Sequence, residues 1–130
     1  MEVNRKDITD ELRAFNRTDI INELGAPAVL EMCAEECTEL AHACLKLARK
    51  MRSDNPTPKT QEECINDLCE EMGDVMLSMD MLFDCGLMSR ESAESWYMEK
   101  EARMYQRVAE RAFERTKREF DLIGVYMKGE

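Results

Sequence analysis

Two short acidic stretches carry the side chains that could bind a metal ion and support hydrolysis. The stretch "EECTEL" (residues 35–40) lies in a segment with the apolar periodicity of a buried helix, and "EEMGDV" (residues 70–75) repeats its pattern further along the chain. Carboxylates beside an apolar stripe are costly unless they are paired or hold a cation. Roughly six acid-x-x-acid pairs are expected by chance in so acidic a chain. The position of these acids on their helices therefore decides whether they form a site.

The two acidic pairs take the same angular positions on their predicted helices. At about 100° per residue, with Cys37 at the centre of the first apolar stripe, Glu36 lies at about −100° and Glu39 at about −160°. Glu71 and Asp74 take the same two angles when the second helix is measured from Met72, the centre of its own stripe. Antiparallel packing along the two stripes would therefore bring four carboxylates together from the flanks.

A cluster of four carboxylates repels itself unless cations hold it together. Oxygen ligands at i, i+3 spacing suit hard divalent ions, so the sequence predicts a site for Mg²⁺ or Mn²⁺. The chain has no G-x-x-x-x-G-K loop to cradle phosphates. A phosphorylated ligand would therefore be held by metal ions and basic side chains.

Three long segments with a 3.6-residue apolar period must position these acids, and strand-like alternation is absent. The first (residues 28–52) follows the turn sequence "GAP" and ends at "SDNPTP". The second begins at Thr60, which has capping-box spacing to Glu63, and ends near Gly86. The third runs from about residue 89 past residue 111 toward residue 120, and residues 6–24 predict one or two shorter helices.

These segments predict an all-α fold of the four-helix-bundle type. The length of 130 residues suits one domain, residues 1–130, in which residues 1–18 and 121–130 are peripheral. Three long amphipathic helices and a short one bury little surface by themselves. We therefore expect a homodimer or homotetramer to complete the bundle.

Composition narrows the classes of partner. The 28 acidic residues outnumber the 18 basic ones, for a net charge of −10, which disfavours nucleic acid and anionic membrane surfaces. No run approaches the roughly 18 apolar residues that span a bilayer. The opening "MEVNRKDITDEL" lacks the apolar core of a signal peptide, so we expect a cytoplasmic protein. The six cysteines, at helical spacing among apolar residues, are predicted to be small buried hydrophobic residues in a reducing compartment.

The chain also resembles the MazG-like all-α nucleoside triphosphate pyrophosphohydrolases. Their E-E-x-x-E and E-x-x-D signatures correspond to residues 35–39 and 71–74. The segments "LGAPAVLEMCAEECTELAHACLKLAR" and "EEMGDVMLSMDML" resemble the first two core helices of the family, and "MEKEARMYQR" resembles the Lys-x-x-Arg segment of its third helix. The resemblance covers roughly residues 19–107, and the acidic signature is its most specific part.

The resemblance implies hydrolysis of a nucleoside triphosphate to the monophosphate and pyrophosphate, with Mg²⁺ as the cofactor. Glu35 would be either the base that deprotonates water or a group that supports the ligands from behind. Glu101 follows Lys100 where many relatives carry Asn, which changes one substrate contact. The implied metal ligands are Glu36, Glu39, Glu71 and Asp74. Glu36, together with Glu35, is also an implied catalytic residue. The implied substrate-binding residues are Lys46, Lys100 and Arg103.

Two other functions fit parts of the sequence. Glu39 and His42 have the E-x-x-H spacing of di-iron carboxylate bundles, and a homodimer could add Glu71 from each copy. On the predicted helix, His42 falls toward the polar arc and away from Glu36, which argues against an iron site. The second alternative is a non-enzymatic helical interaction module whose acids only maintain solubility. The base and sugar of a nucleotide substrate are not fixed by any of these residues.

Overall fold

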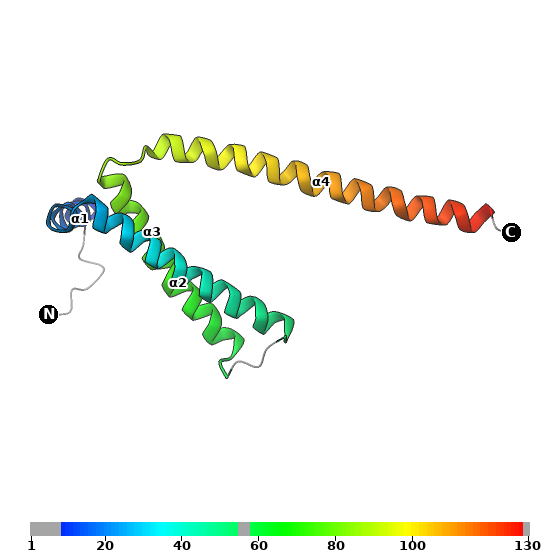
Figure 1. The fold of residues 1–130 in the computed structure, drawn as a ribbon, viewed down its shortest axis with the longest axis horizontal. Helices are drawn as coiled ribbons and strands as arrows, with labels where there is room; N and C mark the ends of the chain where they lie inside the picture. The colour runs from blue at the N-terminus through cyan, green and yellow to red at the C-terminus, as the bar shows by residue number, and fades with distance from the viewer. Residues whose placement is uncertain (1–8, 55–57, 129–130) are drawn as a thin grey trace. The chain divides into compact units, whose positions relative to one another are not determined.

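The structure, a computed structural model, describes residues 9–54 and 58–128 and is almost entirely helical over them. Its helices are α1 (Asp10–Leu24), α2 (Ala26–Arg52), α3 (Gln61–Asp84) and α4 (Arg90–Lys128) (Figure 1). No described residue lies in a strand, so the all-α prediction is confirmed. The predicted bounds of α2 and α3 are correct to within two residues, whereas α4 continues past the predicted end near residue 120.

The chain divides into two compact units, Met1–Ser89 and Arg90–Glu130. The first unit contains α1, α2 and α3, and the second contains α4. The expectation that residues 1–130 act as one domain stays a prediction.

Local sequence explains the junction between α1 and α2. Gly25 has φ 83°, a conformation that residues with a Cβ rarely adopt, and its amide donates a hydrogen bond to the carbonyl of Ile21 (2.8 Å). Pro27 lies in the first turn of α2, where a missing N–H is tolerated. Within the segment expected to be peripheral, Arg17 forms an ion pair with Asp84 of α3 (2.6 Å), which ties α1 to the end of α3.

The start of α3 is fixed by the predicted capping box. The Thr60 hydroxyl accepts a hydrogen bond from the Glu63 amide (3.1 Å), and the Glu63 carboxylate accepts one from the Thr60 amide (2.6 Å). Two amides that would otherwise lack partners at the helix end are thereby satisfied. These hydrogen bonds lower the pKa of Glu63, because they favour its charged form.

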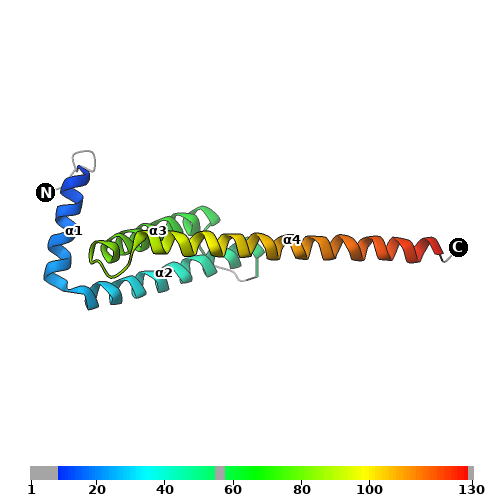
Figure 2. The same cartoon turned by 90° about the horizontal axis from the view of Figure 1, so that it is seen from above.

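Helices α2 and α3 lie side by side and antiparallel, and the surface where they meet differs from the predicted one (Figures 1 and 2). We call this contact surface the seam. Buried and half-buried residues on this side of the two helices include Val29, Met32, Cys33, Glu36, Leu40, Ala43 and Leu47 of α2 and Cys64, Leu68, Glu71, Val75, Ser78 and Leu82 of α3. The seam is centred on Glu36 and Glu71, about a quarter turn from the predicted stripe centres at Cys37 and Met72. The prediction that the acids only flank the packed stripe was therefore wrong.

The deepest part of the first unit lies where all three of its helices meet. Val29 is completely buried, and it packs with Met81 and Leu82. Ile21 of α1 contacts this cluster, together with half-buried residues of α2 and α3. The core at this end of the seam holds α2 and α3 together close to the acidic residues.

Rotation of the seam leaves part of each predicted stripe on the surface. Because the helices are antiparallel, residues a quarter turn from the seam in the same sense point to the same side of the pair. We call this surface the apolar face; its residues are Leu30, Cys37, Cys44 and Met51 of α2 and Ile65, Met72, Met76 and Met79 of α3, all exposed. Of the six free cysteines, Cys64 is buried as predicted, but Cys37, Cys44 and Cys69 are exposed, which corrects that prediction.

Removal of the capping box should measurably weaken the first unit. We expect Thr60→Ala to lower the free energy of unfolding by about 1 kcal/mol, because the Glu63 amide at the start of α3 loses the hydroxyl that accepts its hydrogen bond. Urea unfolding followed by circular dichroism measures the change. Thr38→Ala is the matched control, since the Thr38 hydroxyl only donates to the Ala34 carbonyl within α2. Equal unfolding midpoints for the two variants would contradict the role given to the cap.

Candidate functional site

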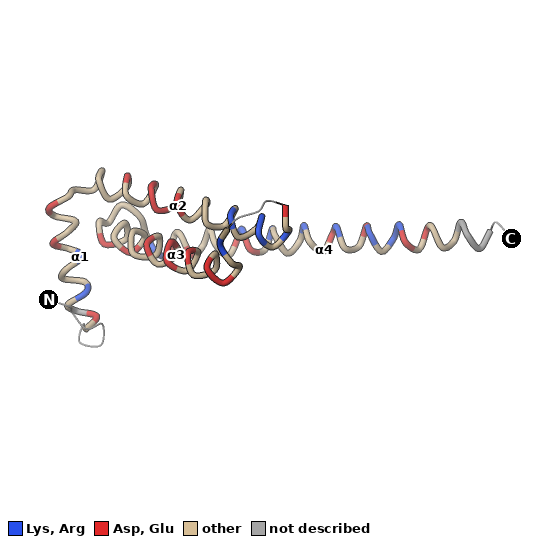
Figure 3. Tube along the Cα trace, turned by 90° about the horizontal axis from the view of Figure 1, so that it is seen from below, with Lys and Arg blue, Asp and Glu red and all other residues tan. Residues whose placement is uncertain are grey.

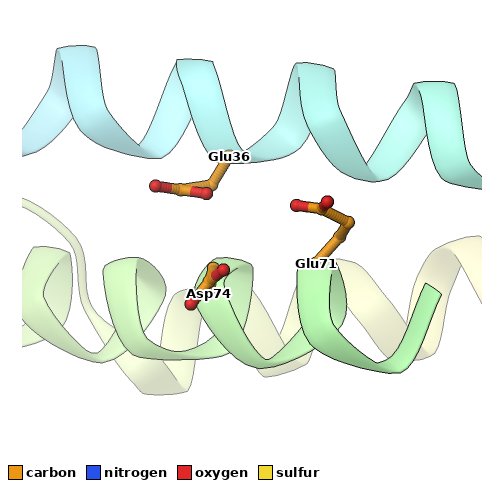
Figure 4. A group of neighbouring side chains, drawn as sticks. All are labelled: Glu36, Glu71 and Asp74. Atoms are coloured by element: carbon orange, nitrogen blue, oxygen red, sulfur yellow. The ribbon is translucent and has the colours of Figure 1, made fainter. Parts of the chain in front are cut away.

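Three carboxylates meet across the seam between α2 and α3. Oxygen atoms of Glu36, Glu71 and Asp74 all lie within 4.8 Å of one another. Glu36 projects from α2, and the other two project from successive turns of α3 (Figure 4). Glu36 and Glu71 are half-buried, whereas Asp74 is exposed. Three of the four predicted metal ligands are thus brought together by the fold.

The fourth predicted ligand, Glu39, lies beside Glu71 and outside this closest group. Its carboxylate is close enough for its charge to add to the effect of burial, which raises the pKa of Glu71. Glu39 and Glu71 also line one surface hollow of about 300 Å³, at the lower end of the range for ligand pockets. The hollow is completed by His42, Ala43, Lys46 and Asp67.

Crowding of like charges in the seam perturbs the carboxylates. The pKa of Glu36 is raised, first because partial burial removes water from its charged form, and then because Asp74, Glu39 and Glu35 are negatively charged neighbours. The pKa of Glu71 is raised for the same first reason, and then by the charge and the hydrogen bond of Glu39. Both shifts thus favour the protonated form of an acid that is partly buried beside other acids.

Oxygen-only ligands on two rigid helices can serve a hard divalent cation. Mg²⁺ is usually held by one or two carboxylates together with water and phosphate, and the exposed side of this cluster leaves room for both. A cation would also offset the neighbouring negative charge that, after burial, contributes to the two raised pKa values. The donor set therefore fits Mg²⁺ or Mn²⁺.

The predicted basic and catalytic residues lie in different places. Glu35 is exposed on α2 and lines a neighbouring hollow with Ala34, Thr38, Glu39 and His42. Lys46 lines the same hollow as Glu39 and Glu71, so the fold brings it to the acids. Lys100 and Arg103 belong to α4 in the second unit, where Arg103 forms an ion pair with Glu99 of its own helix. The fold of the first unit therefore assembles the acids and Lys46, without these two residues of α4.

Asp67 is a member of the site that the sequence did not single out. It lines the hollow with Lys46 and Glu71, and Lys59 donates a hydrogen bond to it (2.6 Å). The pKa of Asp67 is lowered, first by this hydrogen bond, with Lys46 adding a smaller effect through its charge. The sequence could have indicated Asp67, because it lies four residues before Glu71 and residues at i, i+4 share one face of a helix.

The distribution of charge agrees with this division of the chain. Acidic residues recur along α2 and α3, whereas α4 carries acidic and basic residues in alternation (Figure 3). Basic residues of α2 gather in its last turn, where Arg49, Lys50 and Arg52 complement the helix dipole. None of the helices in the described part of the chain combines the length and apolar content that crossing a bilayer requires.

Comparison with protein-family models, with curated proteins and with solved structures finds no match to this chain. The site is therefore interpreted from its own geometry.

The raised pKa values predict that the cation-free protein becomes more stable as the pH falls from neutral toward 4.5, the ordinary value for a glutamate. In this range the folded state binds more protons at Glu36 and Glu71 than the unfolded chain does, so protonation favours folding. Groups with lowered pKa values, Glu63 and Asp67, lose their stabilising effect only at lower pH. Melting temperatures in EDTA at a series of pH values measure the trend.

The matched variants are Glu36→Gln and Glu31→Gln on the same helix. Glu36→Gln should melt higher than wild type at neutral pH and should depend less on pH, because one repelling charge leaves the seam. Glu31 lies on the exposed side of α2, so its variant should follow the wild type. A wild-type melting temperature that stays constant or falls across this range would contradict the account.

Proposed function

We propose that the chain is a Mg²⁺-dependent nucleoside triphosphate pyrophosphohydrolase, which converts an NTP or dNTP to the monophosphate and pyrophosphate. The observation that supports this most directly is the convergence of Glu36, Glu71 and Asp74 across the seam. A triphosphate and a set of four carboxylates each carry about four negative charges, so divalent cations between them would neutralise both. The MazG-like signature of the sequence agrees with the same activity.

The residues that would hold the cations are Glu36, Glu71 and Asp74, with Glu39 beside them. When bound, Mg²⁺ neutralises phosphate oxygens and makes water more acidic. Phosphoryl transfer asks a protein mainly for positioning and charge stabilisation, and acids on two packed helices meet the first need. Substitution of any one ligand should therefore affect activity more than stability.

The remaining residues of the site supply proton transfer and contacts to phosphate. The reaction adds water across the anhydride between the α- and β-phosphorus. The P–O bond of this anhydride breaks, and pyrophosphate leaves. Glu35, exposed next to Glu36, is placed to accept the proton of the attacking water or to support the ligands. Lys46 faces the hollow that holds Glu39 and Glu71, where its ammonium group can meet phosphate oxygens. Lys100 and Arg103 are proposed as further triphosphate contacts from the family resemblance.

A homodimer would complete the bundle through the apolar face. Met72, Met76 and Met79 are 44%, 61% and 45% exposed on α3 alone. Within about 60° of Cys37 on α2 and of Met72 on α3, neither helix carries a charged residue before its last turn. An exposed apolar surface of this width normally marks an interface. Glu39 and Asp74 lie on the other side of the seam, so a second copy seated here would leave the acids accessible.

The proposed activity predicts that pyrophosphate release from one or more members of a panel of NTPs and dNTPs depends on Mg²⁺. Glu71→Gln and Asp74→Asn should each lower kcat/KM by about 100-fold or more, because each removes a negative ligand that neutralises the cation. Glu62→Gln, in the exposed first turn of α3, is the matched control and should keep wild-type activity. Circular dichroism establishes that the variants remain folded.

Two results would overturn this proposal. One is the absence of Mg²⁺-dependent pyrophosphate release from every nucleotide in the panel. The other is full activity in both ligand variants. If Mg²⁺ also left the melting temperature unchanged, the non-enzymatic interaction module would be the better description.

A carboxylate-bridged di-iron site is the second candidate, because His42 lines the same hollow as Glu39 and Glu71. The position of His42 beside these two acids favours an iron site, whereas the helical projection of the sequence argued against one. His42→Ala separates the two functions. The pyrophosphohydrolase should retain activity within about threefold, since no proposed step uses the imidazole, whereas an iron site should lose its bound iron. Iron content by elemental analysis and pyrophosphate release are measured on the same preparations.

A further inference from the structure

Helix α4 makes up the regular structure in the described part of its unit, and its side chains up to residue 124 lie largely in solvent. It runs for 39 residues. Over residues 90–124, every side chain is exposed except Glu101 and Ala112, which are half-buried. A helix of this kind buries no core by itself, and helices in proteins owe most of their stability to a packed apolar face. The pattern of apolar and charged residues on the surface of α4 therefore indicates which kind of partner packs against it.

One face of α4 has the spacing of a coiled-coil seam. Apolar or small residues recur at alternating intervals of four and three, at Met98, Ala102, Tyr105, Ala109, Ala112 and Thr116. This is a heptad repeat, whose period of 3.5 residues keeps the stripe facing a partner helix along its length. Tyr105 on this stripe is 64% exposed. The expected partner is thus another helix of similar length.

Charge along α4 is divided so that two copies complement each other in one orientation. Residues 90–101 contain four acids and two bases, whereas residues 106–117 contain four bases and two acids. In an antiparallel pair, the acidic part of each copy lies opposite the basic part of the other. A parallel pair would place like charges together at both ends, which is destabilising.

The antiparallel register also aligns the stripe. When Met98 lies opposite Ala109 of the second copy, Ala102 lies opposite Tyr105, so each of the two large side chains of the stripe meets an alanine, while Ala112 meets Ser95 and Thr116 meets Glu91. In the same register Glu94 lies beside Arg115 of the other copy, and symmetry supplies this ion pair twice. The overlap covers residues 90–117, about 42 Å of helix, and buries on the order of 1,000 Å² over both copies, the lower bound for a specific interface.

We propose that α4 is a self-association helix, which packs antiparallel against α4 of a second copy of this chain. The interaction is separate from the acidic cluster and does not depend on catalysis. Together with the apolar face of the first unit, it gives the chain two distinct surfaces for self-association. Bonds within the helix, such as those of Glu99 with Arg103 and of Gln106 with Glu110, support an exposed helix but leave the apolar heptads unexplained.

The first test measures the mass of the full-length chain in solution by sedimentation velocity over a range of concentrations, without nucleotide. Ala109→Glu places a charge in the proposed interface and should weaken association by about 100-fold or more, which halves the mass at a concentration where the wild type is assembled. Met104→Glu is the control, because Met104 is 56% exposed on the same helix but lies outside the stripe. A monomeric wild type, or an Ala109→Glu mass equal to that of wild type, would overturn the proposal.

The second test uses the ion pair and does not rely on a disruptive charge in the interface. Glu94→Arg should weaken association, because it meets Arg115 of the second copy. The double variant Glu94→Arg/Arg115→Glu should restore the wild-type mass, since both pairs are then formed with the charges exchanged. Failure of the second substitution to restore association would overturn the antiparallel arrangement. These outcomes are independent of pyrophosphate release, so they separate this proposal from the proposed function.

Discussion

Electrostatic repulsion among carboxylates in the seam between α2 and α3 is the constraint on which the rest of the first unit depends. Helix pairs normally fill such positions with apolar residues, because burial of apolar surface is the main favourable term in packing. Here Glu36 and Glu71 occupy the centre of the contact surface, with oxygens within 4.8 Å of each other and of Asp74. Burial, followed by the charge of neighbouring carboxylates, raises the pKa of both glutamates. Buried groups at Val29 and Leu82 hold the helices together around them.

The position of the acids has a structural consequence on the opposite side of the helix pair. Because the seam is centred on Glu36 and Glu71, part of the apolar stripe of each helix points away from it, and Met72 and Met76 remain exposed. The acidic cluster and the apolar face therefore both follow from the way in which α2 and α3 are turned about their axes. The acids open to one side, where a charged substrate can approach, and the apolar face on the other side is free for a second copy. Helix α4 adds an independent heptad surface, so the two proposals together place a self-association surface on each unit.

Much of the fold could be predicted from the sequence, because local signals were strong. The capping box at Thr60 and the glycine turn at Gly25 set the starts of α3 and α2 correctly. The direction in which each helix faces could not be derived in the same way. The apolar centre of a single helix shows what should be covered, without showing what covers it, and here the stripes around Cys37 and Met72 remain available to another molecule. The acids were found because their pattern repeats between the two helices, whereas Asp67 was missed because it lacks a counterpart in that repeat.

The most direct test of the central claim is a titration of the cation-free protein with Mn²⁺, followed by the electron paramagnetic resonance signal of the free ion. The account predicts saturable loss of the signal, reversal by excess Mg²⁺, and loss of binding in the double variant Glu36→Gln/Glu71→Gln. A signal that rises in proportion to added Mn²⁺, as it does in buffer, would contradict the claim that the seam carboxylates form a divalent cation site.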